Sequence, residues 1–326
     1  MMSTDFKQIL MFPGARKLVD VCAAVQQGEK VLIVTDVERI SVAKSIASAC
    51  VARGAEVVVM IMTPRKVHGI EPPAPIVAAM SAADVVFEPT SKSIAHTAAT
   101  QGAREKGARV ITLAEITEEM LISGAIEADF EAQKQTTERV MEALSQASKA
   151  RVYSDAGTEI EMSLEGRRGR ALTGLACERG SYSSPPNIEA SIAPVEGTAN
   201  GVVIVDASIS GIGLISNPVR IKVQEGVARA IEGGEEARKL RQMLKSANNP
   251  YAYYIAELGI GLNPKASLKG SLLEDEAVLG TVHIALGSNA DFGGTIRAGL
   301  HVDSIIWKPT LELDGKVILE EGELRI

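Results

Sequence analysis

The stretch VLIVTDVERISVAKSIASACVARGAEVVVMIM, residues 31–62, decides the fold of the first part of the chain. Its two ends, VLIVTD (31–36) and EVVVMIM (56–62), are short apolar runs rich in branched residues, typical of strands that are buried on both faces. Between them, an alanine-rich segment (41–53) predicts a helix that ends at Gly54, a favourable C-cap residue. A strand, a helix and a strand in this order predict a βαβ unit of a parallel sheet.

The same alternation continues further along the chain. ADVVFEP (83–89) and ARVITL (108–113) have the composition of two more buried strands, and they flank a second helical segment that Gly107 closes. We therefore expect residues 1–130 to form an α/β domain with a doubly wound parallel sheet. The turn after the first strand reads VERIS and lacks the glycines of a dinucleotide-binding loop. The domain is thus interpreted as a scaffold or as one wall of a substrate site.

The pattern of predicted secondary structure changes after residue 150. A charged segment predicts a connecting helix over residues 131–150, and residues 151–326 alternate short strands with glycine-rich turns. An Ala-Gly pair at 156–157 and an Asp-Gly pair at 314–315 mark two hairpins, and one helix is expected near 234–247. This part is predicted to be an α+β domain, mostly antiparallel, that carries a metal site.

Composition excludes several classes of protein. The 326 residues carry 34 basic and 41 acidic side chains, so the formal net charge is 34 − 41 = −7, and 46% of the residues are hydrophobic. A disordered chain or a fibre would not have this balance, and the net acidity argues against nucleic acids and membranes as partners. Three widely spaced cysteines, no apparent signal peptide and no apolar run of about 18 residues predict a cytoplasmic protein.

Two histidines near the end of the sequence are candidate metal ligands. His301 and Asp303 are two residues apart, so on a strand both side chains point to the same face and can reach one ion. His283 lies in a short apolar run between Gly280 and Gly287, and glycines beside a polar strand residue often mark close backbone approach.

Carboxylates in unusual surroundings complete the candidate site. Glu257 interrupts the apolar stretch IAELGIGLNP, where an unpaired charge is costly. Glu189 lies between a proline-rich loop and a possible strand, and Glu276 follows two other acids in LLEDEAVLG. Imidazoles and carboxylates together are suitable ligands for one or two divalent ions.

Several of these segments together resemble the thermophilic metalloaminopeptidases of the aminopeptidase T and S type. They are NIEASIAP, EGTANGVVIVD, AELGIGLNP, EDEAVLGTVHIALG, FGG and HVD, in that order. The resemblance implies a homodimer and two bound divalent ions, Zn, Co or Mn. It implies five ligands for these ions: Glu189, Glu257, His283, His301 and Asp303.

The same resemblance implies a metal-dependent hydrolase. Such an enzyme removes N-terminal residues from short peptides, or cleaves a related small amide, with a metal-activated water. Glu257 would bridge the ions or act as the base, and Glu276 would be the reserve base or would meet a substrate amine. One position departs from the family, because Ala290 stands where the family has a catalytic tyrosine. The three tyrosines of NNPYAYY fit a packed turn better than a replacement for it.

Two other interpretations remain open at this point. The chain is more distantly similar to the 2,5-dihydroxypyridine 5,6-dioxygenases, which share the closing His-x-Asp and use one non-haem Fe(II). That group has a histidine where this chain has Glu257, and the presence of Glu257 together with His283 favours the hydrolase. The third interpretation is a non-catalytic protein that binds a metal or a small molecule, as the missing tyrosine at Ala290 suggests.

Overall fold

The structure, a computed structural model, describes residues 4–326, which fold as two compact units. The first unit ends at Glu131 and also includes Leu172–Asn187, and the second comprises Ala132–Ala171 and Ile188–Ile326. One unit holds a parallel sheet and the other holds antiparallel sheets, so the prediction of a mixed α/β fold is confirmed. The domain boundaries proposed at residues 130 and 150 stay a prediction.

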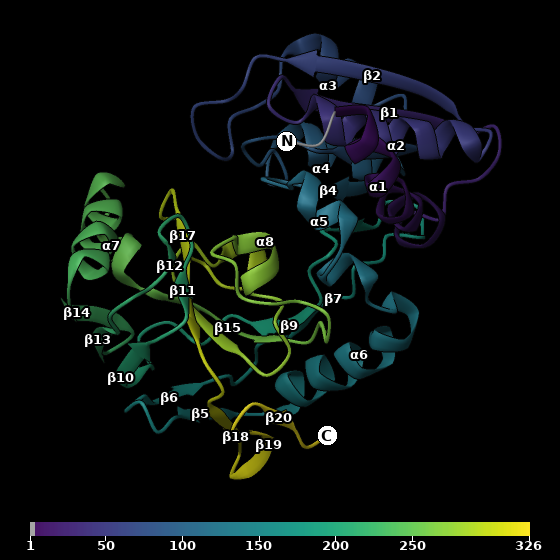
Figure 1. The fold of residues 1–326 in the computed structure, drawn as a ribbon. Coiled ribbons are helices and arrows are strands. Elements are labelled where there is room, and N and C mark those ends of the chain that lie inside the picture. The colour runs from purple at the N-terminus through teal and green to yellow at the C-terminus, as the bar shows by residue number, and fades with distance from the viewer. Residues whose placement is uncertain (1–3) are drawn as a thin grey trace. The chain divides into compact units, whose positions relative to one another are not determined.

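The first unit is built on a five-stranded sheet with the order β2-β1-β3-β4-β8. All of its neighbouring strands are parallel. Its strands are β1 (Lys30–Asp36), β2 (Glu56–Met62), β3 (Val85–Glu88), β4 (Arg109–Thr112) and β8 (Tyr182–Ser183). Its helices are α1 (Thr4–Lys17), which continues into a π-helical turn (Leu18–Cys22), α2 (Ile40–Ala52), α3 (Ala74–Met80), α4 (Ala98–Glu105), α5 (Glu118–Ile122) and a 3-10 turn (Ala125–Glu127) (Figure 1).

Apolar side chains hold the parallel sheet and its helices together. Val34 on β1, Val86 on β3 and Val110 on β4 have no exposed surface and pack into one cluster with Met80 of α3. The strands predicted from residues 31–62 are β1 and β2, and the helix between them is α2, so this prediction is confirmed.

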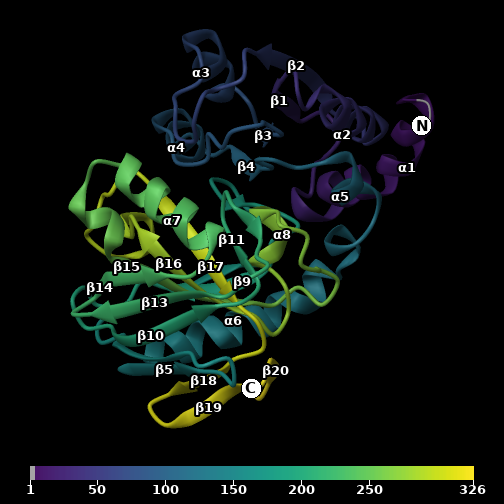
Figure 2. The ribbon, with the colours of Figure 1, turned by 60° about the vertical axis from the view of Figure 1, so that its left-hand side comes forward.

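The second unit contains two antiparallel sheets. The eight-stranded sheet has the order β14-β13-β10-β6-β5-β18-β19-β20, and Figure 2 shows β14, β13 and β10 side by side. The seven-stranded sheet has the order β12-β11-β17-β16-β15-β9-β7. The strands of the first are β5 (Lys149–Tyr153), β6 (Glu159–Ser163), β10 (Asn200–Val205), β13 (Val219–Gln224), β14 (Val227–Glu232), β18 (Thr310–Leu313), β19 (Lys316–Glu320) and β20 (Glu323–Leu324). Those of the second are β7 (Arg170–Leu172), β9 (Glu189–Ile192), β11 (Ser208–Ile209), β12 (Gly213–Leu214), β15 (Ile255–Gly261), β16 (Val282–Gly287) and β17 (His301–Ile306).

Helices and turns complete this unit. The helices are α6 (Phe130–Gln146), α7 (Glu235–Ser246) and α8 (Leu272–Asp275), with 3-10 turns at Pro250–Tyr253 and Ala290–Phe292. The predicted hairpin at Asp314 and Gly315 joins β18 to β19, and both residues have positive φ, as a tight two-residue turn requires. The helix expected near 234–247 is α7.

Two observations bear on where the protein works. No helix within residues 4–326 has both the length and the apolar composition needed to cross a bilayer. No disulfide joins the cysteines within residues 4–326, where Cys22 and Cys50 are buried and Cys177 is exposed. The cytoplasmic location stays a prediction.

Glu88, the last residue of β3, is a buried carboxyl group in the first unit. The hydroxyl of Thr100 donates a hydrogen bond of 2.7 Å to its Oε1, whereas its Oε2 has no hydrogen-bond partner among residues 4–326. Burial raises the pKa of Glu88 to about 7, because the charged form loses its hydration. The folded protein therefore retains this proton at pH values where the unfolded chain has released it.

We expect Glu88→Gln to stabilise the protein above pH 7. The pKa of this carboxyl rises on folding, so stability falls as pH rises from about 4.5 to 7, the window between the unfolded and folded pKa values. Glutamine removes the ionisation, so the free energy of unfolding at pH 8 should rise by on the order of 3 kcal/mol. Urea unfolding at pH 5 and pH 8 measures this change, with Glu56→Gln on the exposed start of β2 as the control. An equal pH dependence in Glu88→Gln and the unsubstituted protein would contradict the assignment.

Candidate metal centre

Four adjacent strands of the seven-stranded sheet, β17, β16, β15 and β9, carry the predicted ligands. Asp303 on β17 is paired with Ala285 on β16, and Ala285 is paired with Glu257 on β15. Side chains of directly paired residues point to the same face of a sheet. Asp303 and Glu257 therefore project from the same face, separated only by the methyl group of Ala285.

The other predicted ligands lie on this face too. His283 precedes Ala285 by two residues and His301 precedes Asp303 by two, and residues two apart on a strand share a face. Glu189 is paired with Gly261, which is four residues beyond Glu257. The opposite face of the same strands is buried and, apart from Ser304, apolar: Ala190, Ile192, Leu258, Ile260, Val282, Ile284, Leu286, Val302 and Ile306.

Glycines on β15 make room for the imidazole of His283. Gly259 is paired with His283, and a Cβ atom added to Gly259 would lie 1.9 Å from the Nε2 of that ring. The ring of His283 thus lies directly over the backbone of β15. At Gly261 an added Cβ would lie 2.2 Å from the carbonyl oxygen of Val278, so the segment after α8 also packs on glycine. Our sequence reasoning missed these roles, although the spacing Glu257-x-Gly259-x-Gly261 is visible in the sequence.

His301 lies between two carboxylates. Its Nε2 is 2.9 Å from Oε2 of Glu257 and 3.1 Å from Oδ1 of Asp303. The other ring nitrogen, Nδ1, is 2.8 Å from the carbonyl oxygen of Ser288, to which it can donate a hydrogen bond. This backbone contact orients the ring with Nε2 toward the carboxylates, as in many metal-binding histidines.

The structure brings all five predicted ligands into two overlapping sets. The first set is Glu189, Glu257 and His283, and the second is Glu257, His301 and Asp303. Within each set one potential ligand atom per residue lies within 4.8 Å of the others. The Nε2 of His283 is 3.5 Å from Oε2 of Glu189. Glu257 belongs to both sets and lies between them.

Negative charge is concentrated at this face. Burial, and then the charges of Glu189, Asp303 and Glu257, raise the pKa of Glu276 well above its usual range. Burial opposes the charge on His301, yet Asp303 and Glu257 raise the pKa of this imidazole well above its usual range. Four carboxyl groups thus act on one another beside two imidazoles, and a bound cation would offset their mutual repulsion.

Two buried atoms at the centre support the presence of a metal. Oε1 of Glu257 and Nδ1 of His283 have no hydrogen-bond partner within residues 4–326. Buried polar atoms in proteins almost always have one, so such atoms can indicate a ligand or water. The carboxylate and imidazole donors suit Fe(II), Zn(II) or Mn(II). Each set offers one histidine and two carboxylates, which differs from the two histidines and one carboxylate of the facial triad of iron oxygenases.

The loop between β16 and β17 covers one side of His301. The ring of Phe292 stacks on the imidazole with centroids 4.8 Å apart, and the guanidinium of Arg170 lies 5.0 Å from the centroid of Phe292. Ala290, which stands at the position of the aminopeptidase tyrosine, begins the short 3-10 turn of this loop.

Glu196 fixes the conformation of this loop. Its Oε1 accepts hydrogen bonds from the side chain of Asn289 at 2.9 Å and from the backbone N–H of Thr295 at 2.8 Å, and Arg167 pairs with its other oxygen. Burial opposes ionisation, but these donors and the charge of Arg167 together lower the pKa of Glu196 to about 2. The loop that carries Phe292 is therefore held by a carboxylate that remains charged at neutral pH.

The tyrosines considered as replacements pack elsewhere in the turn before β15. The rings of Tyr251 and Tyr254 contact each other with centroids 5.5 Å apart. Tyr253 lines a pocket between α7 and β14.

Comparison with known proteins identifies relatives of the whole chain. The family of 2,5-dihydroxypyridine 5,6-dioxygenases matches residues 14–326. The 2,5-dihydroxypyridine 5,6-dioxygenase of Pseudomonas putida KT2440 is 26% identical over 198 residues. This alignment covers 56% of the chain and 55% of the relative, so the chain spans about half the length of the curated relative that it matches.

Solved structures with the same fold include members of both groups named above. The structure of 2,5-dihydroxypyridine dioxygenase from Pseudomonas putida KT2440 is similar with a TM-score of 0.82 and 20% identity, covering 100% of this chain and 98% of that one. Wild-type AmpT from Thermus thermophilus, an aminopeptidase, has a TM-score of 0.72 and 15% identity, covering 98% of this chain and 100% of its own. At these identities the similarity shows a shared fold.

The prediction of a metal-dependent hydrolase of the aminopeptidase type is wrong. The family match over residues 14–326 points to a dioxygenase, which sequence analysis gave as the second interpretation. Glu257 and His283 do not identify a hydrolase, because carboxylates and imidazoles determine which cations can bind and not which reaction follows. The aminopeptidase resemblance holds for the fold alone.

Gly259→Ala should weaken metal binding and leave the fold intact. The new methyl group would occupy the place of the His283 ring, which must then turn away from Glu189. Loss of this oriented imidazole, either as a ligand or as a group that positions the ligands, should lower metal affinity by about 10-fold or more. Titration with Mn(II), Zn(II) and Fe(II) against a chromophoric chelator measures this affinity, and circular dichroism checks the fold. Gly102→Ala, on α4 where no atom lies within 4 Å of an added Cβ, is the control. Unchanged affinity in Gly259→Ala would exclude a role of the His283 ring in metal binding.

Proposed function

Because the chain belongs to the 2,5-dihydroxypyridine 5,6-dioxygenase family, we propose that it is an iron-dependent enzyme that opens the ring of a hydroxylated pyridine with O₂. The family match over residues 14–326 is the observation that carries this proposal. The buried cluster of carboxylates and imidazoles supports it, since such donors hold the metals that react with O₂. The relative from Pseudomonas putida is named for 2,5-dihydroxypyridine, which is therefore the first substrate to test.

In this proposal Glu257, His301 and Asp303 hold the iron. The side chain of His301 is 23% exposed, whereas those of Glu257 and Asp303 are at most 5% exposed. Substrate and O₂ would therefore approach this set from the side of His301. When bound, Fe(II) supplies the one-electron chemistry that allows O₂ to react with an electron-rich ring.

The surrounding residues would orient the ligands and move a proton. The carbonyl of Ser288 would keep Nε2 of His301 directed at the ion. Glu189 and His283, which contact each other and lie beside Glu257, would limit the positions that the Glu257 side chain can adopt. Glu276, whose pKa is raised by burial and by the neighbouring carboxylates, would exchange a proton with a hydroxyl group of the substrate.

Oxygen uptake tests the proposed function directly. Protein loaded anaerobically with Fe(II) is mixed with 2,5-dihydroxypyridine in an oxygen electrode, and the ring absorbance is followed in parallel. We expect one O₂ consumed per ring opened, with both atoms of ¹⁸O₂ recovered in the product. Failure of Fe(II)-loaded protein to consume O₂ with 2,5-dihydroxypyridine and with other dihydroxypyridines would refute the proposal. Such a result would favour the non-catalytic binder instead.

Asp303→Asn should abolish both iron retention and ring opening. The amide cannot supply the negative charge that the proposed site requires, so turnover should fall by roughly 100-fold or more. Iron content after gel filtration and O₂ uptake measure the two effects. Asp206→Asn is a matched control, because Asp206 is a partly buried carboxylate that accepts a hydrogen bond from the backbone of Trp307 outside the cluster. Full iron content in Asp303→Asn would remove this residue from the ligand set.

We also propose that the chain forms a homodimer, as the aminopeptidase resemblance implies. The edge strand β2 of the first unit offers a surface for it, since β2 pairs with β1 on one side only. Val59 and Ile61 on its outer face are 43% and 54% exposed, and Val58 is 52% exposed. An edge strand with exposed branched residues is prone to pair with another chain.

The double substitution Val59→Lys and Ile61→Lys should produce monomers. Two charges on the exposed face of β2 would oppose its burial against a second copy. Sedimentation velocity over a range of protein concentrations measures the change. Val51→Lys, at an exposed position of α2, introduces the same residue elsewhere in this unit and should leave the dimer intact. A dimer that survives the β2 substitutions has its interface on another surface.

A further inference from the structure

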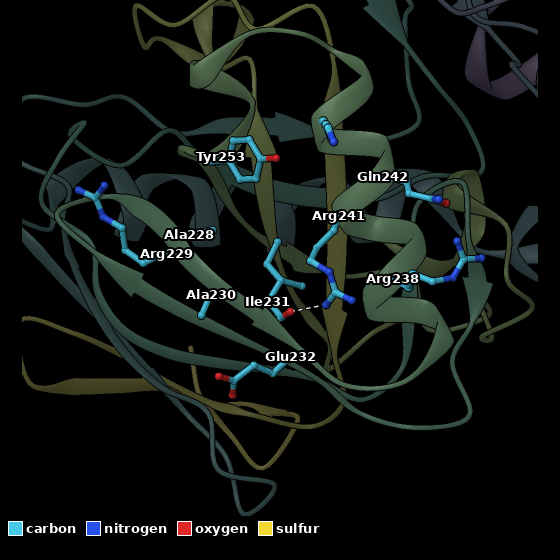
Figure 3. A pocket seen from close by; sticks show the side chains of 10 residues that line it. Ala228, Arg229, Ala230, Ile231, Glu232, Arg238, Arg241, Gln242 and Tyr253 are labelled. Atoms are coloured by element: carbon cyan, nitrogen blue, oxygen red, sulfur yellow. Dashed lines mark hydrogen bonds between the residues drawn. The ribbon is translucent and has the colours of Figure 1, made fainter.

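A pocket separate from the carboxylate–imidazole cluster lies in the second unit between α7 and the edge strand β14 (Figure 3). Its volume is about 560 Å³, which falls in the range of small-molecule sites. None of its lining residues belongs to the predicted metal ligands. The lining residues are Ala228, Arg229, Ala230, Ile231, Glu232, Arg238, Arg241, Gln242, Lys245 and Tyr253.

The helix directs a row of cationic side chains at this pocket. Arg238, Arg241 and Lys245 are spaced by three and four residues, which places them on one face of α7. A neighbouring stripe of α7, with Ala237, Leu240 and Leu244, is buried. The pocket has four basic side chains and one acidic side chain, although the whole chain carries a net charge of −7. The pocket is therefore locally positive, although the protein as a whole is negatively charged.

Part of this charge is not neutralised by the protein. Glu232, the single acid of the lining, pairs with Arg220 at 3.1 Å, and Arg238 pairs with Glu235. Arg241 donates a hydrogen bond to the backbone carbonyl of Ile231, which is neutral (Figure 3). Among residues 4–326, neither Arg241 nor Lys245 forms an ion pair with a carboxylate. Two cations thus remain available to a ligand.

The rest of the lining is apolar or aromatic. Ala228, Ala230 and Ile231 of β14 contribute small apolar groups, and the ring of Tyr253 stands beside them (Figure 3). A guanidinium and an ammonium group next to such a surface suit a ligand with one carboxylate on a flat apolar body. A fully hydrated inorganic anion would gain nothing from the apolar part.

We propose that this pocket binds a small organic anion, a carboxylate carried on a planar apolar body, through Arg241 and Lys245. The carboxylate lies against the cations of α7, and the body lies against β14 and Tyr253. The site is independent of the proposed oxygenase reaction, because it shares no residue with the metal centre.

A matched pair of probes tests this proposal on the full chain without metal. Benzoate and benzamide have the same ring and differ in charge, and isothermal titration calorimetry measures the affinity of each. We expect benzoate to bind at one site per chain and benzamide to bind at least about 10-fold more weakly, because charge-assisted hydrogen bonds are roughly twice as strong as neutral ones. Inorganic phosphate should bind more weakly than benzoate.

Variants on the same helix locate the binding site. Lys245→Ala should weaken benzoate binding by about 5- to 20-fold, since a hydrogen bond to a charged group is lost. Lys239→Ala removes the same charge from an exposed position of α7 outside the pocket, and it should leave the affinity unchanged. The proposal is overturned if benzoate does not bind, if benzamide or phosphate binds as tightly, or if Lys239→Ala and Lys245→Ala have equal effects.

Discussion

Burial of several carboxylates on one face of a sheet is the constraint around which the second unit is organised. Glu189, Glu257 and Asp303 are at most 4% exposed, and the charge of a carboxylate removed from water is costly unless a cation or strong donors compensate for it. In the protein alone, His301 provides part of that compensation through its contacts with Glu257 and Asp303. A divalent ion would provide more, because it carries twice the charge and can contact several oxygens at once. Removing any one of these carboxylates therefore changes the electrostatic energy of the carboxylates that remain.

Small residues allow such large groups to share one sheet face. Directly paired side chains on adjacent strands lie about 5 Å apart. His283 is paired with Ile305 on β17, and its ring finds its space on the other side, over Gly259 of β15. On β15 and β16 the site face alternates functional residues with glycine or alanine, as in Glu257-x-Gly259 and His283-x-Ala285. The opposite face of the same strands is buried and, apart from Ser304, apolar, and it anchors them in the core. The rigidity of a fully buried central strand then positions the ligands more precisely than a loop can.

Much of this arrangement follows from local patterns in the sequence. The strand–helix–strand order of residues 31–62 requires only hydrophobic periodicity, and the turn at Asp314 and Gly315 requires only the preference of these residues for positive φ. The spacing of His301 and Asp303 likewise places both on one face without knowledge of the rest. The order of the strands depends on contacts between segments far apart in the sequence, so the proximity of Glu189 to His283 was expected only from a resemblance. The packing of the His283 ring on Gly259 depends on strand register, which no single segment determines.

The type of reaction is less visible in the sequence than the metal site. The seven-stranded sheet fixes which ligands meet, and a sheet of this kind is compatible with relatives that include both an aminopeptidase and a dioxygenase. What separates the two chemistries lies around the ligands: the groups that face the open side of His301, and the proton carriers nearby. In this chain Phe292, on a loop that Glu196 holds in place, stacks on one face of His301, and the position of the aminopeptidase tyrosine is Ala290. A hydrolase of this type uses a donor there for a developing oxyanion, and the side chain of alanine cannot provide one. For distinguishing the two chemistries, Ala290 is therefore a more informative position than the five predicted ligands.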